Sequence, residues 1–270
     1  MPELPEVETV ARGLNQQIAG DVIESIWLGS KPEPLKSSAR EIAAALQSKK
    51  IARVRRSGKH IVFDLEPIGI GSSAIQWIVH LGMTGSLLVT TPENDREKHT
   101  HAVAQLASGR ELRFVDPRRF GRLSVIEKFS PPGSEPLDIS LEDFAALFRG
   151  RKTPIKSALL NQKLLSGVGN IYADEALFRA AIRPRRRAAS LTRDDLSRLH
   201  SALKRVLKHA IKLGGSSISD YVDSNGDEGF FQLKHRVYGR EDKPCLVCKT
   251  PIKRIVISGR SSHYCPECQK

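Results

Sequence analysis

Apolar residues at helical spacing predict a helix over 3–19, which Gly20 ends. Its apolar face consists of Val7, Val10, Ala11, Leu14 and Ile18. The pattern then changes, because short segments alternate apolar and polar residues or are brief apolar runs, as strands are. These segments are 22–28, 50–56, 60–65, 74–90, 102–107 and 111–115. Many short strands joined by turns are typical of a sandwich or a barrel.

Two local signals agree with this interpretation. Ser38 and Glu41 have the spacing of a capping box, which predicts that a short helix over 39–47 lies between the strands. Ser108 and Gly109 separate two strand segments and predict a hairpin turn.

Helical periodicity returns after Pro131-Pro132-Gly133. It predicts helices over 141–149, 154–165, 171–181 and 193–213. The last begins at a capping box of Thr192 and Asp195, and Gly214-Gly215 ends it. Residues 216–229 are polar and contain glycine, so we expect a mobile loop there. Strands followed by helices place the chain in the α+β class.

The net charge of the 270 residues is +13, which favours a polyanionic partner. Nucleic acid is the first candidate for this partner. Residues 1–130 contain 18 lysines and arginines against 15 acidic residues, and the remainder contains 25 against 15. The phosphates should therefore lie mainly against the second half. A surplus of charge for solubility remains the alternative. No apolar run is long enough to span a membrane and the start lacks a signal peptide, so we expect a cytoplasmic protein.

The four cysteines have the spacing of a zinc ribbon. Cys245-x2-Cys248 and Cys265-x2-Cys268 are separated by sixteen residues, which predicts one Zn²⁺ ion held by four thiolates. Such a site has no open position, so the ion is expected to be structural. Free reduced cysteines are the alternative. Arg260 should lie near the tip of the hairpin, where it either grips a phosphate or is simply solvated.

Asn170 and Pro2 can each be interpreted either structurally or functionally. Asn170 follows a glycine-containing turn and would cap the helix behind it, at a helix N-terminus that suits a phosphate. Pro2, exposed by removal of Met1, would present a secondary amine that can attack carbonyl-level carbon, with Glu3 as an acid and Glu6 positioning the amine. Proline and glutamate also simply favour a first helical turn.

The whole chain resembles the formamidopyrimidine-DNA glycosylase family. The residues that carry the resemblance are Met1 to Thr9 (MPELPEVET), His80 to Gly85 (HLGMTG), Asp116 to Gly121 (DPRRFG), Gly167 to Ala173 (GVGNIYA), and Gly259-Arg260 between the cysteine pairs. The resemblance implies a catalytic β-sandwich with an N-terminal helix over 1–132, a helix–two-turn–helix DNA-binding domain over 133–235 and a zinc-finger hairpin over 236–270. Double-stranded DNA with an oxidised base would be the partner, and the protein would be a monomer associated with the bacterial nucleoid.

The family's chemistry implies roles for catalytic residues. The amine of Pro2 attacks C1′ of the damaged nucleotide, and Glu3 protonates the sugar as the base leaves and a Schiff base forms. Lys59 matches the lysine assigned to β-elimination, and Arg260 matches the arginine assigned to δ-elimination. The loop Ile218-Ser219-Asp220-Tyr221 matches the part that closes over the flipped base.

The resemblance also implies DNA contacts. Met83, Arg118 and Phe120 match the residues that fill the space left by the flipped nucleotide, although Met83 and Phe120 could instead be core residues. The other expected contacts are His99, Arg151, His80, Lys156, Asn170 and Tyr238. His99 and His101 could alternatively be a metal pair, but no third ligand is evident.

The expected function is removal of 8-oxoguanine and ring-opened purines, followed by strand cleavage. An endonuclease VIII-like enzyme for oxidised pyrimidines is the nearest alternative, and the Leu4-Pro5 start together with Arg118 and Phe120 favours the purine enzyme. A zinc-ribbon protein that binds damaged DNA without cutting it is the alternative from another class. The presence of every matched catalytic residue argues against it.

Overall fold

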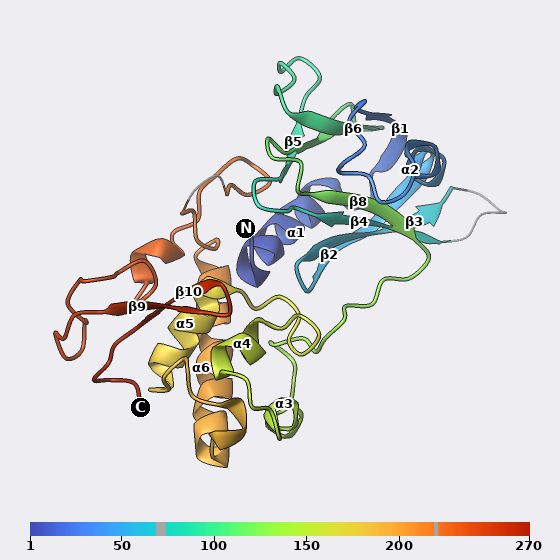
Figure 1. Cartoon of the computed structure of the whole chain (residues 1–270). Helices are drawn as coiled ribbons and strands as arrows, with labels where there is room; N and C mark the ends of the chain where they lie inside the picture. Colours follow the sequence, from blue (N-terminus) through green and yellow to red (C-terminus); the bar gives the residue numbers. More distant parts are fainter. Residues whose placement is uncertain (69–73, 219–220) are drawn as a thin grey trace. The chain divides into compact units, whose positions relative to one another are not determined.

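The computed structural model describes residues 1–68, 74–218 and 221–270. It divides into two compact units (Figure 1). Unit 1 comprises Met1–Ser130 with Gly214–Phe230, and unit 2 comprises Pro131–Leu213 with Phe231–Lys270. The division into three domains at 132 and 235 stays a prediction. No helix in the described part of the chain is both long and apolar enough to cross a membrane.

Unit 1 contains one antiparallel sheet in the order β5-β7-β6-β1-β2-β3-β4-β8. The strands are β1 (Val22–Leu28), β2 (Lys49–Ser57), β3 (His60–Pro67), β4 (Ile75–His80), β5 (Ser86–Thr90), β6 (Thr100–Leu106), β7 (Glu111–Val115) and β8 (Arg122–Ile126). Within the described residues, β1 and β2 pair at only two positions, Val22 with Lys50 and Ile23 with Lys49. This narrow join divides the sheet into two four-stranded halves.

The two halves share one hydrophobic core. Leu112 and Phe114 of one half lie in the same buried cluster as Phe63 and Trp77 of the other. Helix α1 (Leu4–Ile18) adds its predicted apolar face to this cluster, and α2 (Ala39–Leu46) adds Ile42 and Leu46. The capping box of Ser38 and Glu41 is confirmed. Because the two halves of the sheet pack over a common core, they form the predicted sandwich.

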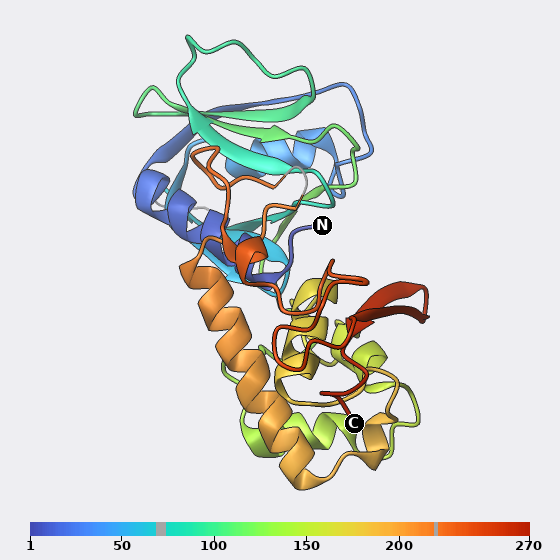
Figure 2. The same cartoon turned by 90° about the vertical axis from the view of Figure 1, so that its left-hand side faces the viewer.

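Unit 2 is mainly helical. Its helices are α3 (Leu141–Phe148), α4 (Ile155–Leu160), α5 (Asn170–Arg179) and α6 (Arg193–Lys212), with short 3-10 turns η1 (Ala188–Ser190) and η2 (Phe231–Lys234). Figure 2 shows α6 in orange as a long straight helix, and it begins at the predicted capping box of Thr192 and Asp195. Strands β9 (Lys253–Ile257) and β10 (Arg260–Tyr264) form a separate antiparallel hairpin. The α+β class is therefore confirmed.

Three predictions of local structure were wrong. The segment 74–90 is two strands, β4 and β5, because the positive φ of Gly82 bends the chain between them. The helix predicted over 154–165 ends at Leu160. Asn170 is the first residue of α5, and Gly169 is its N-cap. β8 was not predicted, although its Arg122, Leu123, Ser124 and Val125 alternate polar and apolar residues, because a run of five residues is a weak signal.

Candidate active site and nucleic-acid interface

The start of the chain is held in place by Glu6. The Glu3 N–H donates to Oε2 of Glu6 at 2.8 Å, in a capping box that begins α1. Oε1 of Glu6 accepts the N–H of Ser216 at 2.7 Å. Pro2, Glu3 and Glu6 are all buried. A single carboxylate therefore links the residue next to Pro2 with the segment 214–217.

In unit 1, several described residues of the segment 214–230 pack on α1. The Tyr221 hydroxyl lies 3.1 Å from the carbonyl oxygen of Gly214 and 3.3 Å from that of Glu6. Burial and the charge of Glu6 raise the pKa of Tyr221. The Gln17 amide donates to Oγ of Ser224 at 2.9 Å. Ser216, Tyr221 and Ser224 of the expected loop thus all contact the N-terminal helix.

The loop predicted to close over the flipped base lies only partly within the described residues. Ser219 and Asp220 lie outside them. Ile218 is exposed, and the Tyr221 carbonyl accepts a hydrogen bond from the Ser217 hydroxyl at 2.9 Å.

Lys59 lies in the turn between β2 and β3 and is buried beside other basic groups. His80 pairs with His60 across β3 and β4, and their rings are 5.0 Å apart. Burial, together with the positive charges of His60, Lys59 and Arg122, lowers the pKa of His80 to about 4. Its Nδ1 accepts the N–H of Gly82 at 3.1 Å, so the neutral ring carries its proton on Nε2. His80 can therefore donate to a phosphate without contributing charge.

Met83, Arg118 and Phe120 are on the surface of unit 1. Met83 is 41% exposed and Phe120 51% exposed, which excludes ordinary core packing for both. The guanidinium of exposed Arg118 lies over the Phe120 ring, 4.8 Å from its centroid. An exposed apolar pair with an adjacent cation suits insertion between bases better than it suits water.

His99 is exposed, whereas His101 is buried, with Nε2 3.0 Å from the carbonyl oxygen of Asp116. In the described part of the chain, the cysteine cluster is the one group of three or more potential metal ligands. The alternative of a metal site at these histidines therefore has no third ligand there.

In unit 2, buried Asp174 joins three elements that contain predicted contacts. One carboxylate oxygen lies 2.6 Å from Nζ of Lys156, and the other accepts the N–H of His263 at 2.8 Å. Nζ of Lys156 also donates to the carbonyl of Ser261 at 2.6 Å. Asn170 lies 3.4 Å from the Ser261 hydroxyl. The buried ammonium of Lys156 thus positions α4, α5 and β10 together, a use that the sequence interpretation did not foresee.

Glu175 was also missed. Its Oε1 accepts the consecutive N–H groups of Arg236, Val237 and Tyr238 at 2.8, 2.9 and 3.1 Å. These bonds fix the backbone that presents Tyr238, whose ring lies 5.1 Å from that of His263. A carboxylate inside an apolar helix face was the available signal, since a fully buried acid needs several partners.

The four cysteines come together as predicted. The sulfur atoms of Cys245, Cys248, Cys265 and Cys268 all lie within 4.8 Å of one another, an arrangement that could hold one zinc ion. A set of four thiolates from two tight turns suits tetrahedral Zn²⁺.

The predicted arginine contacts are exposed. Arg260 begins β10, directly after the turn at Ser258 and Gly259, which both have positive φ. The Ser258 hydroxyl lies 2.8 Å from that of Ser157, so the hairpin tip rests on α4. Arg151 follows α3, and its Nε donates to the carbonyl of Leu147 at 2.5 Å.

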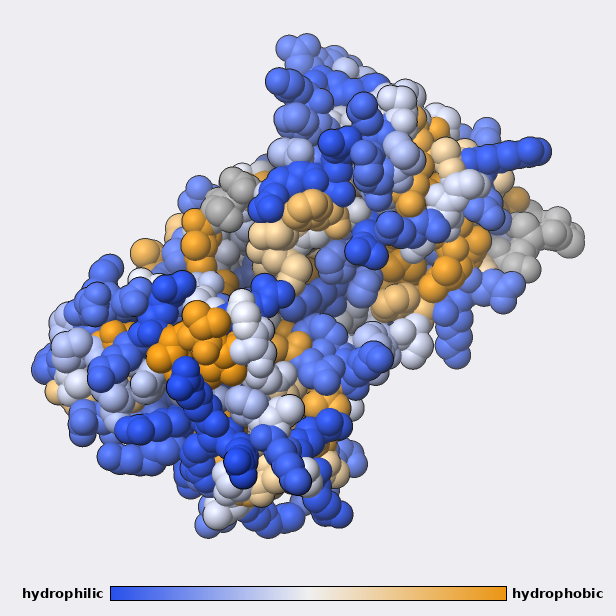
Figure 3. Space-filling model, in the orientation of Figure 1, coloured by the Kyte–Doolittle hydropathy of each residue, from blue (hydrophilic) through white to orange (hydrophobic). Residues whose placement is uncertain are grey.

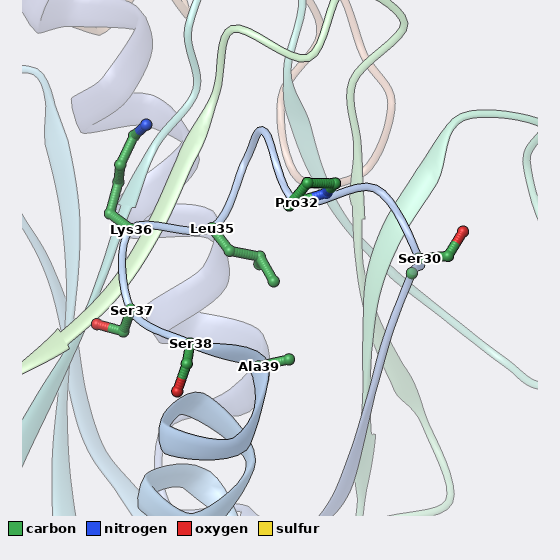
Figure 4. Close-up of a pocket in the computed structure, with 8 residues that line it drawn as sticks. Ser30, Pro32, Leu35, Lys36, Ser37, Ser38 and Ala39 are labelled. Carbon is green, nitrogen blue, oxygen red and sulfur yellow. The ribbon is translucent and has the colours of Figure 1, made fainter.

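Unit 1 also contains a pocket of about 500 Å³ that is separate from the predicted site residues. It is lined by Gly29, Ser30, Pro32, Leu35, Lys36, Ser37, Ser38 and Ala39, in the segment that leads into α2 (Figure 4). None of the predicted site residues lines it.

The face of the molecule in Figure 3 is largely hydrophilic, with scattered hydrophobic patches, as suits a protein whose partner is charged.

Family models match most of the chain. Residues 1–123 match the formamidopyrimidine-DNA glycosylase N-terminal domain, and residues 132–222 match the H2TH domain of the same enzyme. Residues 242–270 match the zinc finger found in FPG and IleRS.

Individual relatives agree over their full length. The chain is 48% identical to a formamidopyrimidine-DNA glycosylase of Solibacter usitatus, with 100% of both chains covered. A Lactococcus lactis FPG variant, solved in complex with Fapy-dG-containing DNA, matches with a TM-score of 0.89 and 34% identity, again over 100% of both chains. The MutM (FPG) protein of Thermus thermophilus matches with a TM-score of 0.86 and 40% identity, covering 99% of this chain and 98% of that one.

Proposed function

The chain belongs to the formamidopyrimidine-DNA glycosylase family, and we propose that it removes oxidised purines from duplex DNA and then cleaves the strand at the abasic site. The substrates are 8-oxoguanine and formamidopyrimidines. The observation that carries the proposal is the buried N-terminal turn of Pro2 and Glu3, which the hydrogen bonds of the Glu6 carboxylate hold in place. The chain that contains this turn matches the family over its full length.

The reaction begins once Met1 has been removed. The secondary amine of Pro2 attacks C1′, and the electron pair of the glycosidic bond leaves with the base, which takes up a proton. Glu3 gives a proton to the ring oxygen as the C1′–O bond breaks, and the amine loses its own proton to form the Schiff base. This iminium draws electrons from the sugar, so a proton on C2′ becomes acidic.

Strand cleavage follows from that acidity. Lys59 assists β-elimination, in which C2′ loses a proton and the 3′ phosphate leaves. Arg260 assists δ-elimination, in which C4′ loses a proton and the 5′ phosphate leaves. The product is a one-nucleotide gap with phosphates on both sides.

The remaining residues bind and position DNA. Met83, Arg118 and Phe120 fill the space left by the everted nucleotide, which offsets part of the cost of unstacking it. His99, Arg151, His80, Asn170 and Tyr238 contact DNA, and Lys156 positions β10. The four cysteines hold zinc in a structural site that keeps the hairpin of Arg260 rigid. The protein acts as a monomer in the cytoplasm, on the nucleoid.

Borohydride trapping tests the proposal. A duplex with one 8-oxoguanine opposite cytosine is incubated with the protein and reduced, and we expect a covalent adduct that maps to Pro2. Pro2→Gly keeps an N-terminal amine but makes it primary, so it serves as a matched variant with slower trapping. An adduct at a lysine, or none, contradicts the assignment of the nucleophile.

The alternatives predict other results. Faster excision from a thymine-glycol·adenine duplex than from 8-oxoguanine·cytosine would favour an endonuclease VIII-like enzyme. Retention of Met1 in the mature protein, detected by mass spectrometry, would block the amine and favour a protein that only binds damaged DNA.

A further inference from the structure

The carboxylate of Asp116 is an anchor shared by two surface turns of unit 1. It is fully buried. Oδ1 accepts the Thr84 hydroxyl at 2.6 Å and the Arg118 N–H at 3.2 Å, and Oδ2 accepts the Gly121 N–H at 2.7 Å. The same side chain thus holds the turn of Arg118 and Phe120 from both ends. Through Thr84 it also reaches the turn that presents Met83.

Close backbone packing reinforces this link. A Cβ atom added to Gly82 would lie 2.5 Å from the carbonyl carbon of Phe120 and from the nitrogen of Gly121, so only glycine fits there. The φ of Gly82 is +68°, which also favours glycine. Beyond it, the Gly85 N–H donates to the carbonyl of Leu81 at 2.9 Å and closes the Met83 turn. The two turns therefore touch without an intervening side chain.

We propose that Asp116 and Thr84 are positioning residues that couple the two turns, so that Met83, Arg118 and Phe120 enter DNA as one preassembled insert. This inference rests on the proposed function, in which these three side chains fill the space left by the everted nucleotide. Neither Asp116 nor Thr84 needs to touch DNA.

The coupling has a physical benefit at the step of base eversion. An apolar wedge stabilises an unstacked duplex more when it is already held in the conformation that fills the gap, because less ordering is then needed on binding. If Met83 moved independently of Arg118 and Phe120, ordering it would cost free energy at that step. The Thr84 hydrogen bond to a buried carboxylate makes this ordering part of the folded state, because charge-assisted hydrogen bonds are among the stronger ones.

A double-mutant cycle tests the coupling. Thr84→Val removes the hydroxyl with little change of shape, Met83→Ala removes the wedge, and Thr84→Ser keeps the hydroxyl as the matched control. Excision from an 8-oxoguanine duplex gives kcat/KM, and 2-aminopurine next to the lesion reports unstacking by its fluorescence. Thermal unfolding is measured for every variant to separate positioning from stability.

We expect Thr84→Val to lower kcat/KM about tenfold and to reduce the fluorescence rise, with Thr84→Ser close to the parent protein. In the Met83→Ala background, Thr84→Val should have little further effect, because the hydroxyl acts through Met83. Additive effects of the two changes, or full activity of Thr84→Val, would overturn the coupling. Normal unstacking by Met83→Ala itself would instead show that the proposed wedge is wrong.

Asp116→Asn provides a second variant. The three groups that donate to this carboxylate lie on both of its oxygens. Whichever way the amide is turned, its NH2 faces a backbone N–H, of either Arg118 or Gly121. We expect a larger loss of kcat/KM and of unstacking than in Thr84→Val. Unchanged fluorescence with this variant would contradict the role of Asp116.

Discussion

At the scale of single residues, buried carboxylates position groups that are predicted to contact DNA. Asp174 illustrates this, since it pairs with the buried ammonium of Lys156 and binds the backbone of His263. We expect Asp174→Asn to lower the free energy of unfolding by about 3–5 kcal/mol, because it leaves a buried charge without its countercharge. Denaturant unfolding followed by circular dichroism measures the change.

The matched control is Glu142→Gln. Glu142 pairs with Arg193 at 2.9 Å, but both side chains are more than two-thirds exposed (68% and 69%). Water screens such a pair, so its loss should cost no more than about 1 kcal/mol. Equal effects of the two substitutions would mean that Asp174 is not structurally coupled to Lys156.

At the scale of elements, we expect the four-cysteine hairpin to depend on metal for its rigidity. Its small buried cluster contains Phe178, Val237, Cys245, Ile252 and Cys265, which is little apolar surface for an independent fold. We expect removal of zinc by a chelator to abolish DNA binding, because Arg260 then loses its fixed position. Fluorescence anisotropy with a lesion duplex measures this, and tight binding by metal-free protein would show that the hairpin is dispensable.

The sequence predicted elements wherever their own periodicity determines them. The predicted boundaries of α1 and α6 lie within one residue of those observed, and the predicted cysteine cluster is present. β8 was missed although it alternates polar and apolar residues, because a five-residue run is a weak signal and its pairing with β4 is not visible in the sequence. Contacts far apart in sequence were equally invisible. Glu6 with Ser216, Asp174 with His263 and Thr84 with Asp116 are examples. The roles of the catalytic and DNA-contacting residues stay predictions.

At the scale of the whole molecule, the uneven charge predicts which residues govern the salt dependence of binding. Residues 131–270 contain most of the excess, with 25 basic against 15 acidic residues. Each phosphate contact releases counterions, so the logarithm of the binding constant falls with that of the salt concentration by about 0.9 per contact. Exposed Arg151 is expected to make one such contact.

We therefore expect Arg151→Ala to weaken binding equally for lesion and undamaged duplexes and to reduce the salt slope by about one. Lys50→Ala removes an exposed cation from β2 of unit 1 and should leave the slope unchanged. Titrations by anisotropy between 50 and 200 mM salt, about the range in which counterion release dominates, give both slopes. If the two variants shift the slope alike, net charge alone attracts the DNA and the position of Arg151 is irrelevant. A change confined to Arg151→Ala would instead place the phosphates against the second half of the chain.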